Sequence, residues 1–70
     1  MKKLMEMEME KLMQEAIKEW EMRVAMRNAV KEQYPQSGYC SVGPDETGVF
    51  YAHFENGNRW ETVVEWQLGL

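Results

Sequence analysis

The fold is decided by residues 4–33, which read LMEMEMEKLMQEAIKEWEMRVAMRNAVKEQ. Most of these residues are strong helix formers, and the run contains no Gly or Pro. Glutamates gather near its start and basic residues near its end, which is the order that a helix dipole favours. Pro35 ends the run, because a proline pushes the residue before it out of the helical region. The stretch therefore predicts one helix over almost half of the chain.

This helix is too long for the domain that the chain can form. Thirty helical residues extend roughly 45 Å at a rise of ~1.5 Å per residue. A compact domain of this length has a radius of gyration of about 11 Å and a diameter of about 28 Å. The helix must therefore protrude, bend, or pack on another chain.

The apolar residues of the helix lie on two different faces. At about 100° per residue, one broad stripe comprises Met5, Met9, Leu12, Met13, Ala16, Ile17, Trp20 and Val24. A later group sits on nearly the opposite face and comprises Met22, Ala25, Met26 and Ala29. A stripe that changes sides predicts two partners, which are the chain's own sheet and the helix of a second copy. We expect the residues of the first stripe from Met5 to Ile17 to form a homodimer interface. The alternative is a monomer whose helix is kinked near residues 21–23.

Strand-forming residues replace the helix formers after Pro35. The sequence predicts strands over residues 39–42, 49–54 and 59–66, with a turn-rich loop over 43–48 and a hairpin signal at Asn56-Gly57. We expect an α+β fold in which one long N-terminal helix packs on a three-stranded antiparallel meander. Seventy residues predict a single domain that spans residues 1–70.

Burial selects the register of the hairpin. A two-residue loop at Asn56-Gly57 mixes large apolar side chains with charges on both faces of the sheet. A three-residue loop over 55–57, with Gly57 left-handed in a bulge, separates them, because a slip of one residue moves every side chain to the other face. The apolar face then carries Phe50, Ala52, Phe54, Trp60, Thr62, Val64 and Trp66. We expect Trp60 and Trp66 in the core, with Trp20 as the anchor from the helix.

Composition excludes several classes of function. A net charge of −4 argues against a general nucleic-acid binder and against binding to an anionic membrane. One cysteine cannot form an internal disulfide, and one cysteine with one histidine argues against a zinc site. We find no catalytic, metal or cofactor motif, and expect neither an enzyme nor a cofactor. Glutamates interrupt any signal peptide, which predicts a cytoplasmic protein. So short a chain often needs oligomerisation for stability.

The open face of the sheet is the second candidate surface. We expect it to bind a protein partner through Tyr39, Tyr51, His53, Arg59 and Val63. Cys40 with Val42 is expected to face the core as a small hydrophobic residue. Exposed aromatic residues on a sheet also suit the stacking of nucleic-acid bases, but the neighbouring glutamates would repel phosphates.

The leading hypothesis is a homodimeric protein-binding module that occludes a partner's surface. Small acidic α+β chains of this type are common among inhibitors that phages and plasmids encode, including anti-CRISPR and other anti-defence proteins, although no motif supports the likeness. The first alternative is a nucleic-acid-binding module that adds Arg23, Arg27 and Lys31 to the sheet aromatics. The second alternative is an enzyme subunit with His53 as an acid or base in a cleft at the dimer interface.

Overall fold

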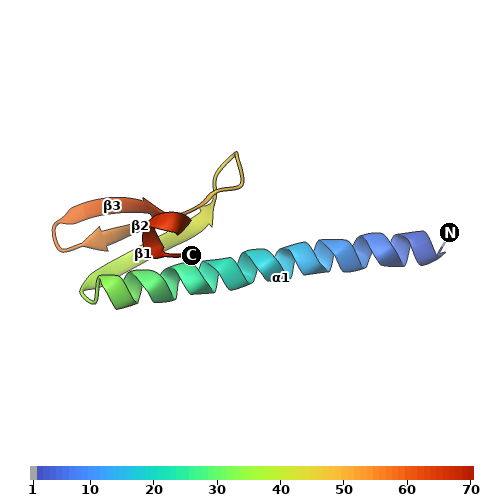
Figure 1. Ribbon diagram of the computed structural model, residues 1–70, viewed down its shortest axis with the longest axis horizontal. Helices are drawn as coiled ribbons and strands as arrows, with labels where there is room; N and C mark the ends of the chain where they lie inside the picture. Colours follow the sequence, from blue (N-terminus) through green and yellow to red (C-terminus); the bar gives the residue numbers. More distant parts are fainter. Residues whose placement is uncertain (1) are drawn as a thin grey trace.

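The computed structural model describes residues 2–70, with side chains from residue 9 onward. Its elements are the helix α1 (Lys2–Gln33), the strands β1 (Ser37–Pro44), β2 (Phe50–Asn56) and β3 (Arg59–Val64), and the 3₁₀ helix η1 (Glu65–Leu68). The strands form one antiparallel sheet in the order β1-β2-β3. The predicted α+β arrangement of one long N-terminal helix followed by three antiparallel strands is confirmed (Figure 1).

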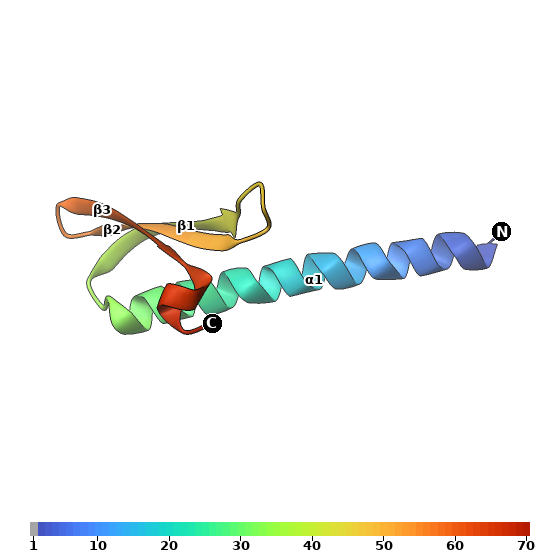
Figure 2. The ribbon, with the colours of Figure 1, turned by 45° about the horizontal axis from the view of Figure 1, so that its top comes forward.

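The N-terminal half of α1 projects away from the sheet (Figures 1 and 2). The molecule measures 55 × 21 × 20 Å and has a radius of gyration of 15.4 Å, against about 11 Å for a compact chain of this length. Every side chain from Met9 to Glu21 is exposed. The helix continues through residues 21–23 without turning back on the sheet, so the alternative of a kinked monomer that buries both faces is wrong.

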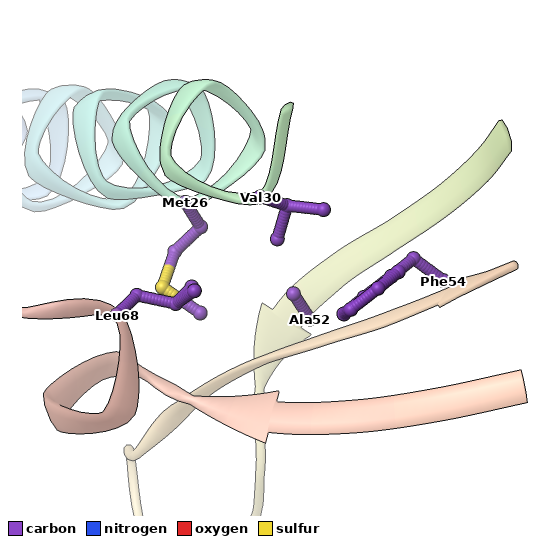
Figure 3. Packing of buried hydrophobic residues seen from close by; sticks show 5 residues of the cluster. All are labelled: Met26, Val30, Ala52, Phe54 and Leu68. Carbon is purple, nitrogen blue, oxygen red and sulfur yellow. The ribbon is translucent and has the colours of Figure 1, made fainter. Parts of the chain in front are cut away.

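The core lies between the C-terminal half of α1 and one face of the sheet. Its buried side chains, shown in Figure 3, are Met26, Val30, Ala52, Phe54 and Leu68. Tyr34 closes the end of this core, with its ring centroid 4.9 Å from that of Phe54. Cys40 and Val42 pack against the same cluster, which confirms the prediction that they face inward.

Trp20 is not the helix-side anchor of the core, contrary to the sequence prediction. Its side chain is 64% exposed, whereas Met26 and Val30 are buried. At 3.6 residues per turn, the core-facing residues of α1 are centred about 125° around the helix from the stripe that contains Trp20. The sheet therefore packs on the second apolar face of the helix and leaves the first uncovered.

The register of the β2–β3 hairpin also differs from the prediction. Asn56 pairs with Arg59, which leaves the two-residue turn Gly57-Asn58 and places Glu61 opposite Phe54. Gly57 has a φ of +65°, whereas no non-glycine residue in the described part of the chain has a positive φ, Asn58 included. This is the pattern of a type II′ turn rather than of a bulge. The tip of the hairpin extends past the end of α1 (Figures 1 and 2). Arg59, next to this tip, is exposed although its position in the register belongs to the helix side of the sheet.

The chain leaves the sheet after Val64, so the predicted strand over residues 59–66 ends two residues early. In η1, Leu68 is 5% exposed and enters the core, whereas Trp66 is 64% exposed, which corrects the prediction that Trp66 is buried. The Gln33 side chain donates a hydrogen bond of 3.1 Å from Nε2 to the carbonyl oxygen of Leu68. This bond ties the C-terminal segment to the end of α1.

Asp45 organises the loop between β1 and β2. Its Oδ1 atom accepts hydrogen bonds from the Thr47 hydroxyl at 2.6 Å and from the backbone N–H groups of Thr47 and Val49 at 2.8 and 3.0 Å. These bonds, the Thr47 hydroxyl above all, lower the pKa of Asp45 below its ordinary value. The loop is thus held by a charged carboxylate although it lies at the surface.

Candidate binding surfaces

One exposed apolar surface lies along the projecting part of α1. We call it the helix stripe, and among the described side chains it comprises Met9, Leu12, Met13, Ala16, Ile17 and Trp20. The five large residues of the stripe are between 51% and 65% exposed. Met5, which is also predicted to take part in dimerisation, has a side chain outside those that the structure describes.

The stripe is continuous because its members follow helical spacing. They span about 140° of the helix circumference, which is broad enough to meet a flat apolar surface and wider than the narrow seam of a coiled coil. The largest exposed apolar patch of a typical monomer is often functional, so the helix stripe is a candidate interaction surface. An ion pair of Glu19 with Arg23, at 3.5 Å, lies where the stripe ends.

A second exposed surface lies on the side of the sheet that faces away from α1. We call it the aromatic face, and its ring-bearing residues are Tyr39, Tyr51, His53 and Trp60. The His53 and Trp60 rings stack with centroids 5.0 Å apart and planes 14° from parallel. Tyr39 meets Trp60 edge-on at 6.2 Å. The cluster thus joins all three strands.

Exposure distinguishes this cluster from a small second core. Tyr39 is 67% exposed and Trp60 is 54% exposed. Aromatic side chains with so much free surface contribute little to the stability of the monomer and offer a large contact area to a partner.

The five predicted partner-binding residues lie on two different faces of the sheet. Tyr39, Tyr51 and His53 lie on the aromatic face as expected. Val63 pairs with Ala52 and packs against the core, so its predicted exposure on the open face is wrong. Arg59 follows the alternation of Val63 and also belongs to the helix side of the sheet, since the register is shifted by one residue.

Trp60 is the member of the aromatic face that the sequence prediction missed. The prediction assigned it to the core because it assumed a three-residue loop. The dipeptide Gly57-Asn58 is itself a signal for a two-residue hairpin turn, with Gly at the first central position. This signal would have given the observed register and placed Trp60 on the open face.

Glu55 contributes a carboxylate to the aromatic face. It lies directly opposite Trp60 in the register of β2 and β3. On the other side, the pairing of β1 with β2 is irregular between Ser37 and Cys40, next to Tyr39. Gly38 leaves room for the Glu55 side chain: a Cβ atom at position 38 would lie only 3.3 Å from Glu55 Oε2. The Glu55 carboxylate therefore leans toward β1 at Gly38, which precedes Tyr39 in the sequence.

The cysteine and histidine do not form a catalytic pair. Cys40 is paired with Phe54 and packs on the core, whereas His53 lies on the opposite face of the sheet. Burial raises the pKa of the Cys40 thiol, and the positive charge of Arg27 opposes this effect more weakly. His53 Nδ1 lies 2.7 Å from the Thr62 hydroxyl oxygen, which fixes the ring on Trp60.

No group of three or more His, Cys, Asp or Glu side chains in the described part of the chain is arranged to hold a metal ion. Across residues 2–70, no helix combines the length and apolar character needed to cross a membrane. A shallow, open depression beside the middle of α1 is lined by Met22, Ala25 and Leu70, with Lys18 and Glu21 at its rim.

Comparison of this chain with family models, with curated proteins and with solved structures finds no match.

Proposed function

We propose that this chain is a non-catalytic protein-binding module that self-associates through the helix stripe and binds a partner through the aromatic face. The observation that carries the proposal is the helix stripe, whose large side chains are at least half exposed although they lie on a regular helix. The chain's own sheet packs on a different face of α1, so the fold leaves this stripe uncovered.

Self-association is supported by the distribution of apolar surface along the molecule. Burying a large aliphatic side chain is worth roughly 1.5–3 kcal/mol, and each of the five large residues of the stripe still has half or more of its surface to bury. A second copy of α1 presents the same stripe at the same spacing, as a two-fold symmetric interface requires. A 70-residue chain whose described part buries five hydrophobic side chains also gains stability from such a partner.

Solution mass tests the homodimer. We expect light scattering across a dilution series to show a dimer of the 8.3 kDa chain that dissociates at low concentration. Ile17→Asp places a charge within the stripe and should yield a monomer at every concentration tested. Gln14→Asp adds the same charge to an exposed position on the other side of the same helix, and should leave the dimer intact. A wild-type chain that stays monomeric at high concentration contradicts this half of the proposal.

Partner binding is supported by the aromatic face, whose exposed tyrosine and tryptophan are residue types that dominate protein interfaces. A module of this kind acts by covering its partner's surface, which is how an occluding inhibitor works. We expect a tagged chain to capture a protein from a lysate of its cognate host, and Trp60→Ser to abolish that capture. Gln36→Ser, at an exposed position outside the sheet, serves as the control and should leave the capture unchanged. Capture that is absent from the wild type, or unaffected by Trp60→Ser, contradicts the assignment of this face.

A further inference from the structure

The charge on the aromatic face is of one sign. Of the strand residues whose side chains lie on this face, Glu55 is the only one with a formal charge, and it is exposed. Arg59 adjoins Trp60 in the sequence, but the register places it on the other side of the sheet. Lys31, at the end of α1, donates its hydrogen bond to the carbonyl oxygen of Ser37 at 2.9 Å. The surface therefore combines electron-rich rings with a carboxylate that forms no ion pair with the side chains described from residue 9 onward.

The geometry brings these groups within the reach of one ligand side chain. Trp60 lies directly across from Glu55, and Tyr39 lies in β1 beside the glycine over which the Glu55 carboxylate leans. His53 supports Trp60 from one side and is itself held by Thr62, so the indole is fixed before any ligand arrives. Fixed rings reduce the conformational entropy that a partner must remove on binding.

We infer that the aromatic face binds an arginine side chain of a basic, extended segment in the partner protein, with the guanidinium against Trp60 and Tyr39 and its N–H groups donating to Glu55. This inference rests on the proposed function and names the chemistry of the partner.

Charge complementarity selects arginine among the possible ligands. A cation over an aromatic ring is attracted by the negative face of the ring, and a guanidinium also stacks on it and pairs with a carboxylate through two N–H groups. A nucleic-acid strand would stack on the same rings, but its phosphates would meet Glu55 and a chain of net charge −4. A neutral peptide would leave the carboxylate without a partner.

Two matched peptides test this inference with the full-length chain. One is Arg-Gly-Arg-Gly-Arg-Gly-Arg, and the other has citrulline, which has the same shape without the charge, at each arginine. We expect NMR titration of the wild type to move the Trp60 indole N–H and the amides of Tyr39 and Glu55, with at least ten-fold tighter binding of the arginine peptide. Glu55→Gln should reduce this preference to two-fold or less.

Glu32→Gln is the control, because it removes the same charge from an exposed position at the end of α1, away from the aromatic face. If Glu32→Gln weakens the arginine peptide as much as Glu55→Gln does, the attraction is general and the assigned site is wrong. Equal binding of both peptides, binding of neither, or stronger binding of an oligothymidylate at Trp60 each overturns the inference. Capture of a protein that depends on Trp60 would still uphold the proposed function in those cases, so the two claims fail separately.

Discussion

Alanine replacements of Trp20 and Met26 should have opposite consequences, although the two residues lie less than two turns apart on α1. Met26 is 0% exposed and points from the helix toward Leu68 (Figure 3). Truncation of a buried methionine to alanine costs about 2–5 kcal/mol, because it removes packing contacts and leaves a cavity. Small domains unfold at a cost of about 5–15 kcal/mol, so Met26→Ala removes a large part of the stability.

Trp20 is 64% exposed, so Trp20→Ala should cost the monomer less than about 1 kcal/mol. Its effect belongs to the dimer. A fully buried tryptophan covers about 150–250 Å², of which about 100–160 Å² remains free here. If the partner covers half of this area, the loss at ~25 cal/mol per Å² is about 1.3–2 kcal/mol per protomer. Two copies then raise the dissociation constant of the dimer roughly 60- to 700-fold.

Urea unfolding followed by circular dichroism separates these effects when it is measured at two protein concentrations, one below and one above the dissociation constant of the dimer. Met26→Ala should lower the free energy of unfolding at both concentrations. Trp20→Ala should lower it only at the higher one. If Trp20→Ala were as costly as Met26→Ala in the dilute sample, Trp20 would belong to the core, and the proposed packing of α1 on the sheet would be refuted.

Three further outcomes follow from local structure. Gly57 has a φ of +65°, so Gly57→Ala should cost about 1–2 kcal/mol in thermal unfolding, whereas Gly43→Ala, with open space and no positive φ, should cost less. Because the pKa of Asp45 lies below 3.8 in the folded chain, its contribution to stability should be complete above about pH 4 and lost as the pH falls through the folded pKa. In Asp45→Asn, the free energy of unfolding, measured across a pH series, should therefore fall less steeply at acid pH than in the wild type. Burial raises the pKa of Cys40, so a thiol reagent at pH 8 should modify the folded chain more slowly than the urea-unfolded chain; equal rates would contradict this packing.

The helix could be predicted from sequence because its signals are local and agree with one another. Helix-forming residues run without a break up to Pro35, and the length of this run required the helix to protrude, bend, or pack on another chain. The presence and order of the three strands followed from equally local patterns of β-branched and aromatic residues, separated by turn-forming residues.

The positions of the three tryptophans were predicted wrongly, because burial was inferred from size and apolar character. Buried residues are mostly apolar, but large apolar residues are also common on surfaces, so apolar character does not establish burial. The exposure of Trp20 depends on which face of α1 packs on the sheet, and the exposure of Trp60 depends on the strand register that the turn at Gly57 sets. The exposure of Trp66 depends on where the chain leaves the sheet. Leu68 enters the core only through the tertiary closure of η1 on α1, which no local pattern reports.

If two copies pair antiparallel through the helix stripe, the projecting arm of α1 also sets how many partner segments one assembly can bind. Such a dimer would hold its two aromatic faces on rigid supports, each at the far end of a molecule 55 Å long. A partner that displays one basic segment would engage one face with modest affinity. A symmetric or repetitive partner with two such segments at the matching separation would bind the second at a high effective concentration, with avidity 10²- to 10⁴-fold above that of one face. The length of the helix would then fix the distance between the two aromatic faces, and so favour oligomeric targets whose basic segments are separated by the same distance.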